Sequence, residues 1–190
     1  MKVVAINGSI HKNGNTATML NEVLSVVKEN GGETMLLQVG GTNIHGCKAC
    51  RQCANLKNKK CVFADDCFND IFTECLDADA IILGTPSYFS NMSPELKSFI
   101  DRAGFVALQN GGLFRHKIGA GIVAQRRGGG SLVQATIHTM FLMSEMIIPG
   151  STYWNFGIGM NEGEVVSDAE AMQNMRNLGE NIVWLANKVK

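Results

Sequence analysis

Near its start the sequence reads Val3-Val4-Ala5-Ile6-Asn7-Gly8, a short apolar run rich in β-branched residues that ends at a turn signal. Such a run is typical of a strand that is buried on both faces of a sheet. Residues 16–28 follow with apolar side chains at helical spacing, and Gly31-Gly32 supplies the stop of that helix. A buried strand joined to a helix by a short polar loop is the repeating unit of a parallel sheet covered by helices.

The same alternation continues along the chain. Ser93-Pro94 carries a helix-start signature, because a capping hydroxyl precedes a proline. Further strands are expected at 34–39, 80–84 and 118–124 and one opening at Ile147-Ile148, with helices at 66–77, from Pro94 onward, at 131–146 and at 169–188. The pattern predicts one α/β domain over residues 1–190, a three-layer, doubly wound fold with a five-stranded parallel sheet. Residues 40–61 are rich in Gly, Asn and Lys and form a cysteine-bearing insertion after the second strand.

The composition narrows the class of protein. The 190 residues are 45% hydrophobic and carry 17 Lys+Arg against 17 Asp+Glu, so the basic excess typical of nucleic-acid binding is absent. No apolar run approaches the roughly 20 residues of a membrane span, and no signal-peptide pattern is present. We therefore expect a cytoplasmic protein that binds neither nucleic acid nor membrane, in which 6 cysteines indicate metal or redox chemistry.

The loop from Gly8 to Thr16 joins the first strand to the first helix. Its Ser, Asn and Thr side chains and its free amides gather at a helix N-terminus, which favours an anion. Asn15 follows Gly14 where a nucleotide triphosphatase has a Lys-Ser/Thr pair, and Ile10 interrupts the GxGxxG dinucleotide pattern. The loop predicts a site for one terminal phosphate, such as that of FMN, and an ordinary polar turn is the alternative.

Two more loops follow strands at the same edge of the predicted sheet. The loop 85–91 contains Tyr88 and Phe89, adjacent aromatic residues that suit a flat isoalloxazine ring or, alternatively, cover the sheet edge. The loop 125–130 joins Arg126 and Arg127 to three glycines. An arginine there suits an anionic reduced flavin or the phosphate of a nicotinamide cofactor, while a merely flexible loop is the alternative.

Taken in order, the three loops resemble those of the NADPH-dependent FMN reductase family over nearly the full chain. The motifs are Gly-Ser-x5-Asn-Thr (Gly8 to Thr16), Gly-Thr-Pro-Ser-Tyr-Phe (Gly84 to Phe89) and Arg-x-Gly-Gly (Arg126 to Gly129). The resemblance implies a flavodoxin-like fold and no catalytic side chain, because the flavin carries the redox chemistry. It implies an FMN held by Ser9, His11, Asn13, Asn15, Thr16, Pro86, Ser87, Tyr88, Phe89, Asn91, Arg126, Gly128 and Gly129.

Four cysteines in the insertion have a distinctive spacing. Cys47, Cys50, Cys53 and Cys61 form Cys-x2-Cys-x2-Cys-x7-Cys, and the first three match the way that bacterial ferredoxins wrap thiolates around a cluster. The pattern resembles the iron–sulfur flavoprotein branch of the family, which implies a [4Fe–4S] cluster close to FMN. A four-thiolate zinc site, free thiols or an oxygen-labile cluster are the alternatives. The remaining two, Cys67 and Cys75, share a helical stripe with Ile71, which predicts core positions.

The segment between Cys47 and Cys61 carries five cations and no acidic residue: Lys48, Arg51, Lys57, Lys59 and Lys60. A solvated loop is the simple interpretation. Cations beside an anionic four-thiolate cluster would also raise its potential and attract an acidic donor such as ferredoxin.

These patterns predict an FMN-dependent oxidoreductase of the iron–sulfur flavoprotein type. Electrons would pass from a ferredoxin-like or NAD(P)H donor through the cluster and FMN to a small acceptor. The resemblance implies acceptors such as oxygen, peroxide or quinones. It also implies a homodimer or homotetramer in which one subunit's cluster lies near its neighbour's flavin. The alternatives are a cluster-free NAD(P)H:FMN or quinone reductase, and a non-catalytic FMN carrier with a zinc site.

Overall fold

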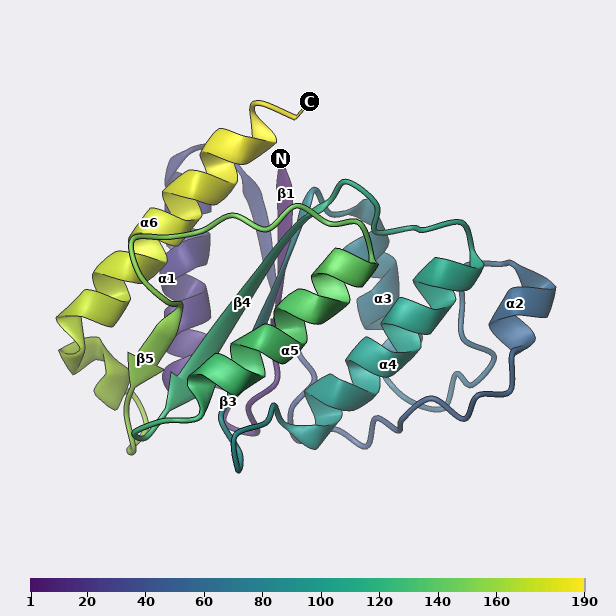
Figure 1. The fold of residues 1–190 in the computed structure, drawn as a ribbon, viewed down its shortest axis with the longest axis horizontal. Helices are drawn as coiled ribbons and strands as arrows, with labels where there is room; N and C mark the ends of the chain where they lie inside the picture. The colour runs from purple at the N-terminus through teal and green to yellow at the C-terminus, as the bar shows by residue number, and fades with distance from the viewer. Residues whose placement is uncertain (190) are drawn as a thin grey trace.

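The structure is a computed structural model, and it describes residues 1–189. Strands and helices alternate along the chain, as Figure 1 shows. In chain order the elements are β1 (Lys2–Asn7), α1 (Asn15–Glu29), β2 (Glu33–Gln38), α2 (Gln52–Leu56), α3 (Phe68–Asp77), β3 (Ala80–Pro86), α4 (Pro94–Gln109), β4 (Ile118–Gln125), α5 (Gly130–Met143), β5 (Phe156–Ile158), the 3-10 helix η1 (Glu164–Ser167) and α6 (Ala169–Ala186).

The five strands form one parallel sheet in the order β2-β1-β3-β4-β5. Val4 of β1 pairs with Met35 of β2 on one side and with Ile81 of β3 on the other. The chain therefore reverses its direction of winding between β1 and β3, which is the switch point of the flavodoxin-like strand order. The predicted three-layer, doubly wound architecture is confirmed.

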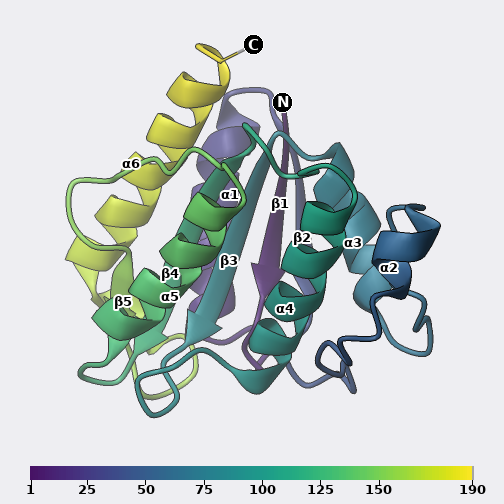
Figure 2. The same ribbon diagram turned by 45° about the vertical axis from the view of Figure 1, so that its right-hand side comes forward.

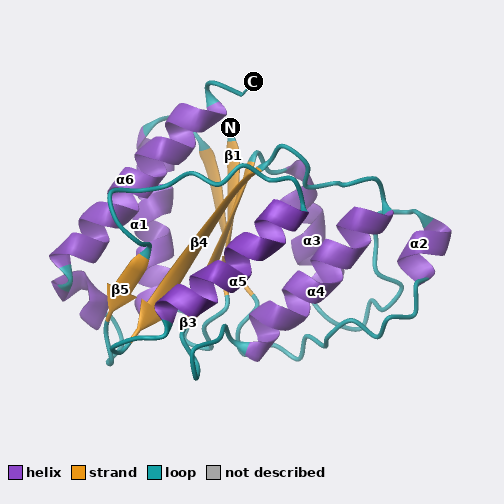
Figure 3. Cartoon of the chain, viewed as in Figure 1, coloured by secondary structure: helices purple, strands orange, loops and turns teal. Residues whose placement is uncertain are grey.

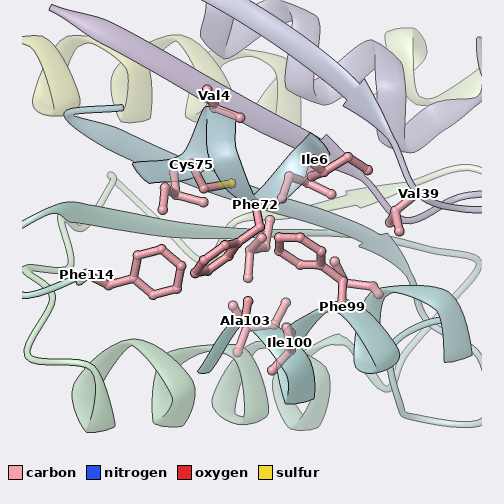
Figure 4. Packing of buried hydrophobic residues seen from close by; sticks show 14 of the residues in the cluster. Val4, Ile6, Val39, Phe72, Cys75, Phe99, Ile100, Ala103 and Phe114 are labelled. Carbon is pink, nitrogen blue, oxygen red and sulfur yellow. The ribbon is translucent and has the colours of Figure 1, made fainter. Parts of the chain in front are cut away.

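Helices cover both faces of the sheet, and each face has its own core. Helices α1 and α6 pack on one face, while α3, α4 and α5 pack on the other (Figures 2 and 3). Alternate residues of β1 divide between the two cores, since Val3 faces the first and Val4 the second. Figure 4 shows the second core, where Phe72 and Phe99 lie beneath β1. This two-sided burial explains why the strands are almost uninterrupted apolar runs.

Most predicted elements are confirmed to within a few residues. The Ser93-Pro94 signature starts α4, and Ser93 Oγ accepts a hydrogen bond from the Leu96 amide at 3.3 Å. In residues 1–189, no helix has the length and apolar character needed to cross a membrane.

The predicted position of the fifth strand is wrong. Ile147 forms only a single bridge with Ile118, and the chain then leaves the sheet at Pro149, which has no amide hydrogen to donate. The strand that completes the sheet is β5, where Phe156 pairs with Val123. This shift moves the loop that follows β5, residues 159–163, to the edge where β1, β3 and β4 also end.

Candidate functional site

A hollow of about 480 Å³ lies at the carboxyl ends of the strands, beside the switch point. Loops after β1, β3, β4 and β5 line it. Eight of the thirteen predicted flavin-binding residues belong to its lining: Ser9, His11, Asn15, Thr16, Pro86, Ser87, Tyr88 and Arg126. The edge of the sheet therefore brings together residues from loops more than a hundred positions apart in the sequence.

The first turn of α1 opens toward this hollow with its amides available. Gly14 is the N-cap residue, and no side chain among residues 1–189 caps the helix there. Ser9 folds the preceding loop, since its Oγ accepts a hydrogen bond from the His11 amide at 3.2 Å. A helix N-terminus without a cap or an acidic first turn leaves amide hydrogens for an anion. A monophosphate group such as that of FMN fits this donor set.

The structure adds a fourth loop that sequence reasoning missed, Gly159 to Glu162. Asn15 holds it, because its Nδ2 donates to the Asn161 carbonyl at 2.9 Å and its Oδ1 accepts from the Val165 amide at 3.1 Å. A Cβ on Gly159 would lie 2.9 Å from the backbone nitrogen of Val165 and 2.7 Å from Asn15 Nδ2, so glycine allows the loop to pack closely here. Asn15 therefore shapes the wall of the hollow through its side chain.

Five predicted residues lie outside the hollow: Asn13, Phe89, Asn91, Gly128 and Gly129. Phe89 is fully exposed, at the tip of a turn closed by two backbone hydrogen bonds between Tyr88 and Asn91. Gly129 has φ +90°, and a Cβ there would come within 2.8 Å of Ser87 Oγ, so glycine permits the close approach of two loops. Tyr88 does line the hollow, and burial, with a smaller effect of Glu95, raises the pKa of its phenol.

The four cysteines of the insertion lie around a second hollow. Cys47, Cys50, Cys53 and Cys61 all line it, with the C-terminal half of α4 as the opposite wall, and its free volume is only about 20 Å³. Cys47 and Cys50 are exposed at its mouth, while Cys53 is buried. Burial raises the pKa of the Cys53 thiol, and nearby Cys61 and Cys47 add smaller contributions in the same direction.

Backbone turns after successive cysteines wrap the segment around this hollow. Ala49 (φ 51°) and Arg51 (φ 59°) adopt the left-handed conformation, which is uncommon for residues other than glycine. The Ala49 amide points back and donates to Cys47 Sγ at 3.4 Å. Such turns aim amides at sulfur, and α2 is the short helix that then carries Cys53.

The donor set is that of a thiolate-bound metal centre. Within residues 1–189, no three Cys, His, Asp or Glu side chains already converge on one point as a metal site. The ligands gathered around the hollow are nevertheless four thiols, the donors that iron–sulfur clusters and structural zinc share. The residues present fit a four-thiolate centre in the kind of donor and in lining one hollow.

Two asparagines hold the cysteine segment, residues 47–61, in place through hydrogen bonds to its backbone, and no sequence motif marks either of them. Asn69 of α3 is paired with the backbone of Cys61, accepting from its amide at 2.9 Å and donating to its carbonyl at 3.0 Å. Asn110, at the end of α4, accepts from the Lys59 amide at 3.0 Å and donates to the Cys53 carbonyl at 3.3 Å. Only the folded structure reveals these bonds, because each joins residues from different elements.

The two remaining cysteines belong to the core of the α3 face. The prediction is confirmed for Cys75, which is fully buried and labelled in Figure 4, and burial raises the pKa of its thiol to about 12. Cys67 is half-buried at the rim of the same cluster, with its Sγ 3.5 Å from Thr42 Oγ1. Neither lines the four-cysteine hollow.

The two hollows occupy different parts of the molecule. They share no lining residue. Figures 1 and 2 both show α2, which carries Cys53, at the opposite side of the molecule from β5.

The chain is similar in sequence and in fold to known flavoproteins. The sequence profile of the family described as NADPH-dependent FMN reductase matches residues 1–161. An iron–sulfur flavoprotein of Methanocaldococcus jannaschii is 32% identical, and the alignment covers 100% of both chains. One of Archaeoglobus fulgidus is 31% identical over 100% of this chain and 98% of the relative. The crystal structure of a WrbA-like flavodoxin protein from Agrobacterium tumefaciens superposes with a TM-score of 0.67 at 15% identity, covering 100% of this chain and 98% of that one. The chain thus belongs to the NADPH-dependent FMN reductase family, as an FMN-dependent oxidoreductase with a flavodoxin-like fold.

Proposed function

We propose that this oxidoreductase is of the iron–sulfur flavoprotein type, with a [4Fe–4S] cluster held by Cys47, Cys50, Cys53 and Cys61. The observation that carries the proposal is the gathering of these four thiols around one hollow. The chain also has the hollow at the carboxyl ends of the strands, called the flavin hollow below, where we propose that FMN binds. When bound, the cluster and FMN supply one-electron and two-electron redox chemistry respectively. The names of the similar archaeal proteins support the same proposal.

The flavin hollow would act by binding and orientation. We propose that the first-turn amides of α1, with Ser9 and Thr16, hold the FMN phosphate. Tyr88 can donate a hydrogen bond there, because a phenol is protonated at neutral pH and burial raises its pKa further. Arg126 brings a permanent positive charge to the same hollow, which favours a reduced, anionic flavin.

A second copy of the chain would bring the two hollows together. Within one chain, α2 and β5 lie on opposite sides, so the cysteine segment is remote from the end of the flavin hollow that β5 borders. A homodimer or homotetramer in which this segment approaches a neighbour's flavin would shorten the path of the electrons. We propose this arrangement on the basis of the family resemblance and of the separation of the two hollows.

The donor we propose is a ferredoxin-like protein, with NAD(P)H as the alternative. The five cations of the cysteine segment are all exposed, so they present positive charge around the hollow. Acidic Asp65 and Asp70, which follow the segment in the sequence, are also exposed. Complementary charge accelerates association in a way that salt suppresses.

Flavin reduction by a reduced acidic ferredoxin should therefore slow about tenfold between low and high ionic strength. Lys57→Gln/Lys59→Gln should slow it several-fold at low salt, whereas the matched surface change Lys28→Gln/Lys188→Gln should not. Anaerobic stopped-flow absorbance of the flavin measures both effects. A ferredoxin rate that is independent of salt, together with rapid reduction by NADPH, would favour the cluster-free reductase. No turnover with either donor would favour the carrier.

A further inference from the structure

Arg102, in the middle of α4, is a buried cation in the wall of the four-cysteine hollow. Its side chain is 1% exposed, and arginine is seldom fully buried unless it is paired. It lines the hollow together with Phe105 and Val106 of the same helix. Its charge therefore acts on that hollow with little screening by water.

The guanidinium of Arg102 donates hydrogen bonds to the backbone on both sides of the cysteine segment. Nη1 donates to the His45 carbonyl at 3.3 Å, two residues before Cys47. Nη2 donates to the Phe63 carbonyl at 2.9 Å, two residues after Cys61. The planar fork of an arginine makes both bonds at once, whereas the single ammonium of a lysine could not span them in the same way.

Asp66 is the counter-ion. Its carboxylate, with a side chain 4% exposed, accepts a hydrogen bond from Arg102 Nη1 and others from the His45 amide at 3.2 Å and the Phe68 amide at 3.1 Å. Burial alone raises the pKa of Asp66, but these hydrogen bonds outweigh it and lower that pKa. The pair is ionised at neutral pH, yet only its cationic member lines the hollow.

The guanidinium also has an unused donor. One face of Arg102 lies over the Phe68 ring, with Cζ 4.2 Å from the centroid. Its Nε is buried and finds no hydrogen-bond partner among residues 1–189. A buried N–H without an acceptor is costly, so such groups mark places where a further partner belongs.

We propose that Arg102 is the positioning residue of the proposed cluster, holding both flanks of its ligand segment and raising its reduction potential with a fixed buried charge. The inference rests on the proposed function, because it concerns the group that the four thiols would hold. A positive charge close to the cluster stabilises the state that has gained an electron. Asp66, which does not line the hollow, moderates this effect.

The two partners of this ion pair should shift the cluster potential in opposite directions. Arg102→Gln removes the cation, so it should lower the equilibrium constant for one-electron reduction of the cluster about tenfold. This corresponds to a reduction potential that is about 59 mV lower. Asp66→Asn leaves the charge of Arg102 without its counter-ion, so it should raise the same equilibrium constant several-fold. If the ion pair were merely structural, both substitutions would shift the reduction potential in the same direction. Anaerobic redox titration of the loaded protein, followed by electron paramagnetic resonance, measures the shift.

Three controls separate charge from folding. Arg115→Gln removes an exposed arginine that pairs with Glu145 on the surface and should leave the potential unchanged. Arg102→Lys retains the charge but loses the fork, so it should keep the potential while binding less iron. FMN content reports the fold of each variant, because the flavin hollow shares no residue with this network. Hydrogen exchange of residues 47–61 in the metal-free chain should rise in Arg102→Gln and Arg102→Lys.

The outcomes are distinguishable. A wild-type chain that binds no iron and sulfide overturns the proposed function, and this inference with it. A loaded wild type whose potential is unmoved in Asp66→Asn and Arg102→Gln, or moved in the same direction in both, overturns this inference alone. If Arg102→Gln cannot retain a cluster, the other two variants decide. A higher potential in Asp66→Asn together with an unchanged potential in Arg102→Lys supports the proposal, and any other result contradicts it.

Discussion

Replacing Cys53 with serine should remove about nine-tenths of the iron and acid-labile sulfide bound per chain. Cys53 is the buried member of the four-cysteine set, so water or an outside thiol cannot readily replace its sulfur. A serine hydroxyl is a harder and less acidic ligand, which iron–sulfur clusters accept poorly. Anaerobic purification followed by iron and sulfide analysis measures the loss.

The matched control is Cys67→Ser, which makes the same chemical change outside the hollow. Cys67 Sγ lies beside Thr42 Oγ1, where a serine hydroxyl keeps a hydrogen-bonding partner. We expect full iron content in this variant and unchanged FMN content in both. Equal iron in Cys53→Ser and wild type would show that the four thiols do not ligate the metal.

A carboxylate at the N-cap of α1 should weaken FMN binding about 100-fold, or about 2.7 kcal/mol. In Gly14→Asp the carboxylate would accept hydrogen bonds from the first-turn amides that are free in the native helix. Its negative charge would also repel a phosphate. Gly14→Asn is the isosteric neutral control. Both side chains displace His11, whose Cβ lies 2.8 Å from the position of a Cβ on Gly14, so their difference isolates the charge.

Titration of flavin fluorescence gives the dissociation constants for this comparison. Riboflavin lacks the phosphate, so it should bind the Asp and Asn variants with nearly equal affinity. If FMN binds both variants equally well, the phosphate does not lie at the start of α1.

Local sequence patterns were sufficient for four of the five strands and for much of the lining of the flavin hollow. The run from Val3 to Ile6 has the two-sided burial that its composition indicates. The loop from Ser9 to Thr16 lies at the strand edge, because a parallel sheet places the ends of all its strands together. Residues near a strand end could therefore be predicted without knowledge of their tertiary contacts.

What the sequence did not reveal depends on contacts between distant elements. The three-residue strand β5 is too short for a periodic pattern, so the loop 159–162 that follows it could not be placed at the hollow. Arg102 sits on α4 at a position that a helical pattern treats as one more charged residue. Its role emerges only because folding brings it to Asp66, 36 positions earlier in the chain. Asn69 and Asn110 were missed for the same reason.

The most direct test of the account is the content of flavin, iron, sulfide and zinc per chain after strictly anaerobic purification. A four-thiolate [4Fe–4S] centre in a chain that also binds FMN predicts about four irons, about four sulfides and one FMN per chain, without zinc. One zinc per chain without sulfide, or FMN with no metal at all, would contradict the cluster at Cys47, Cys50, Cys53 and Cys61.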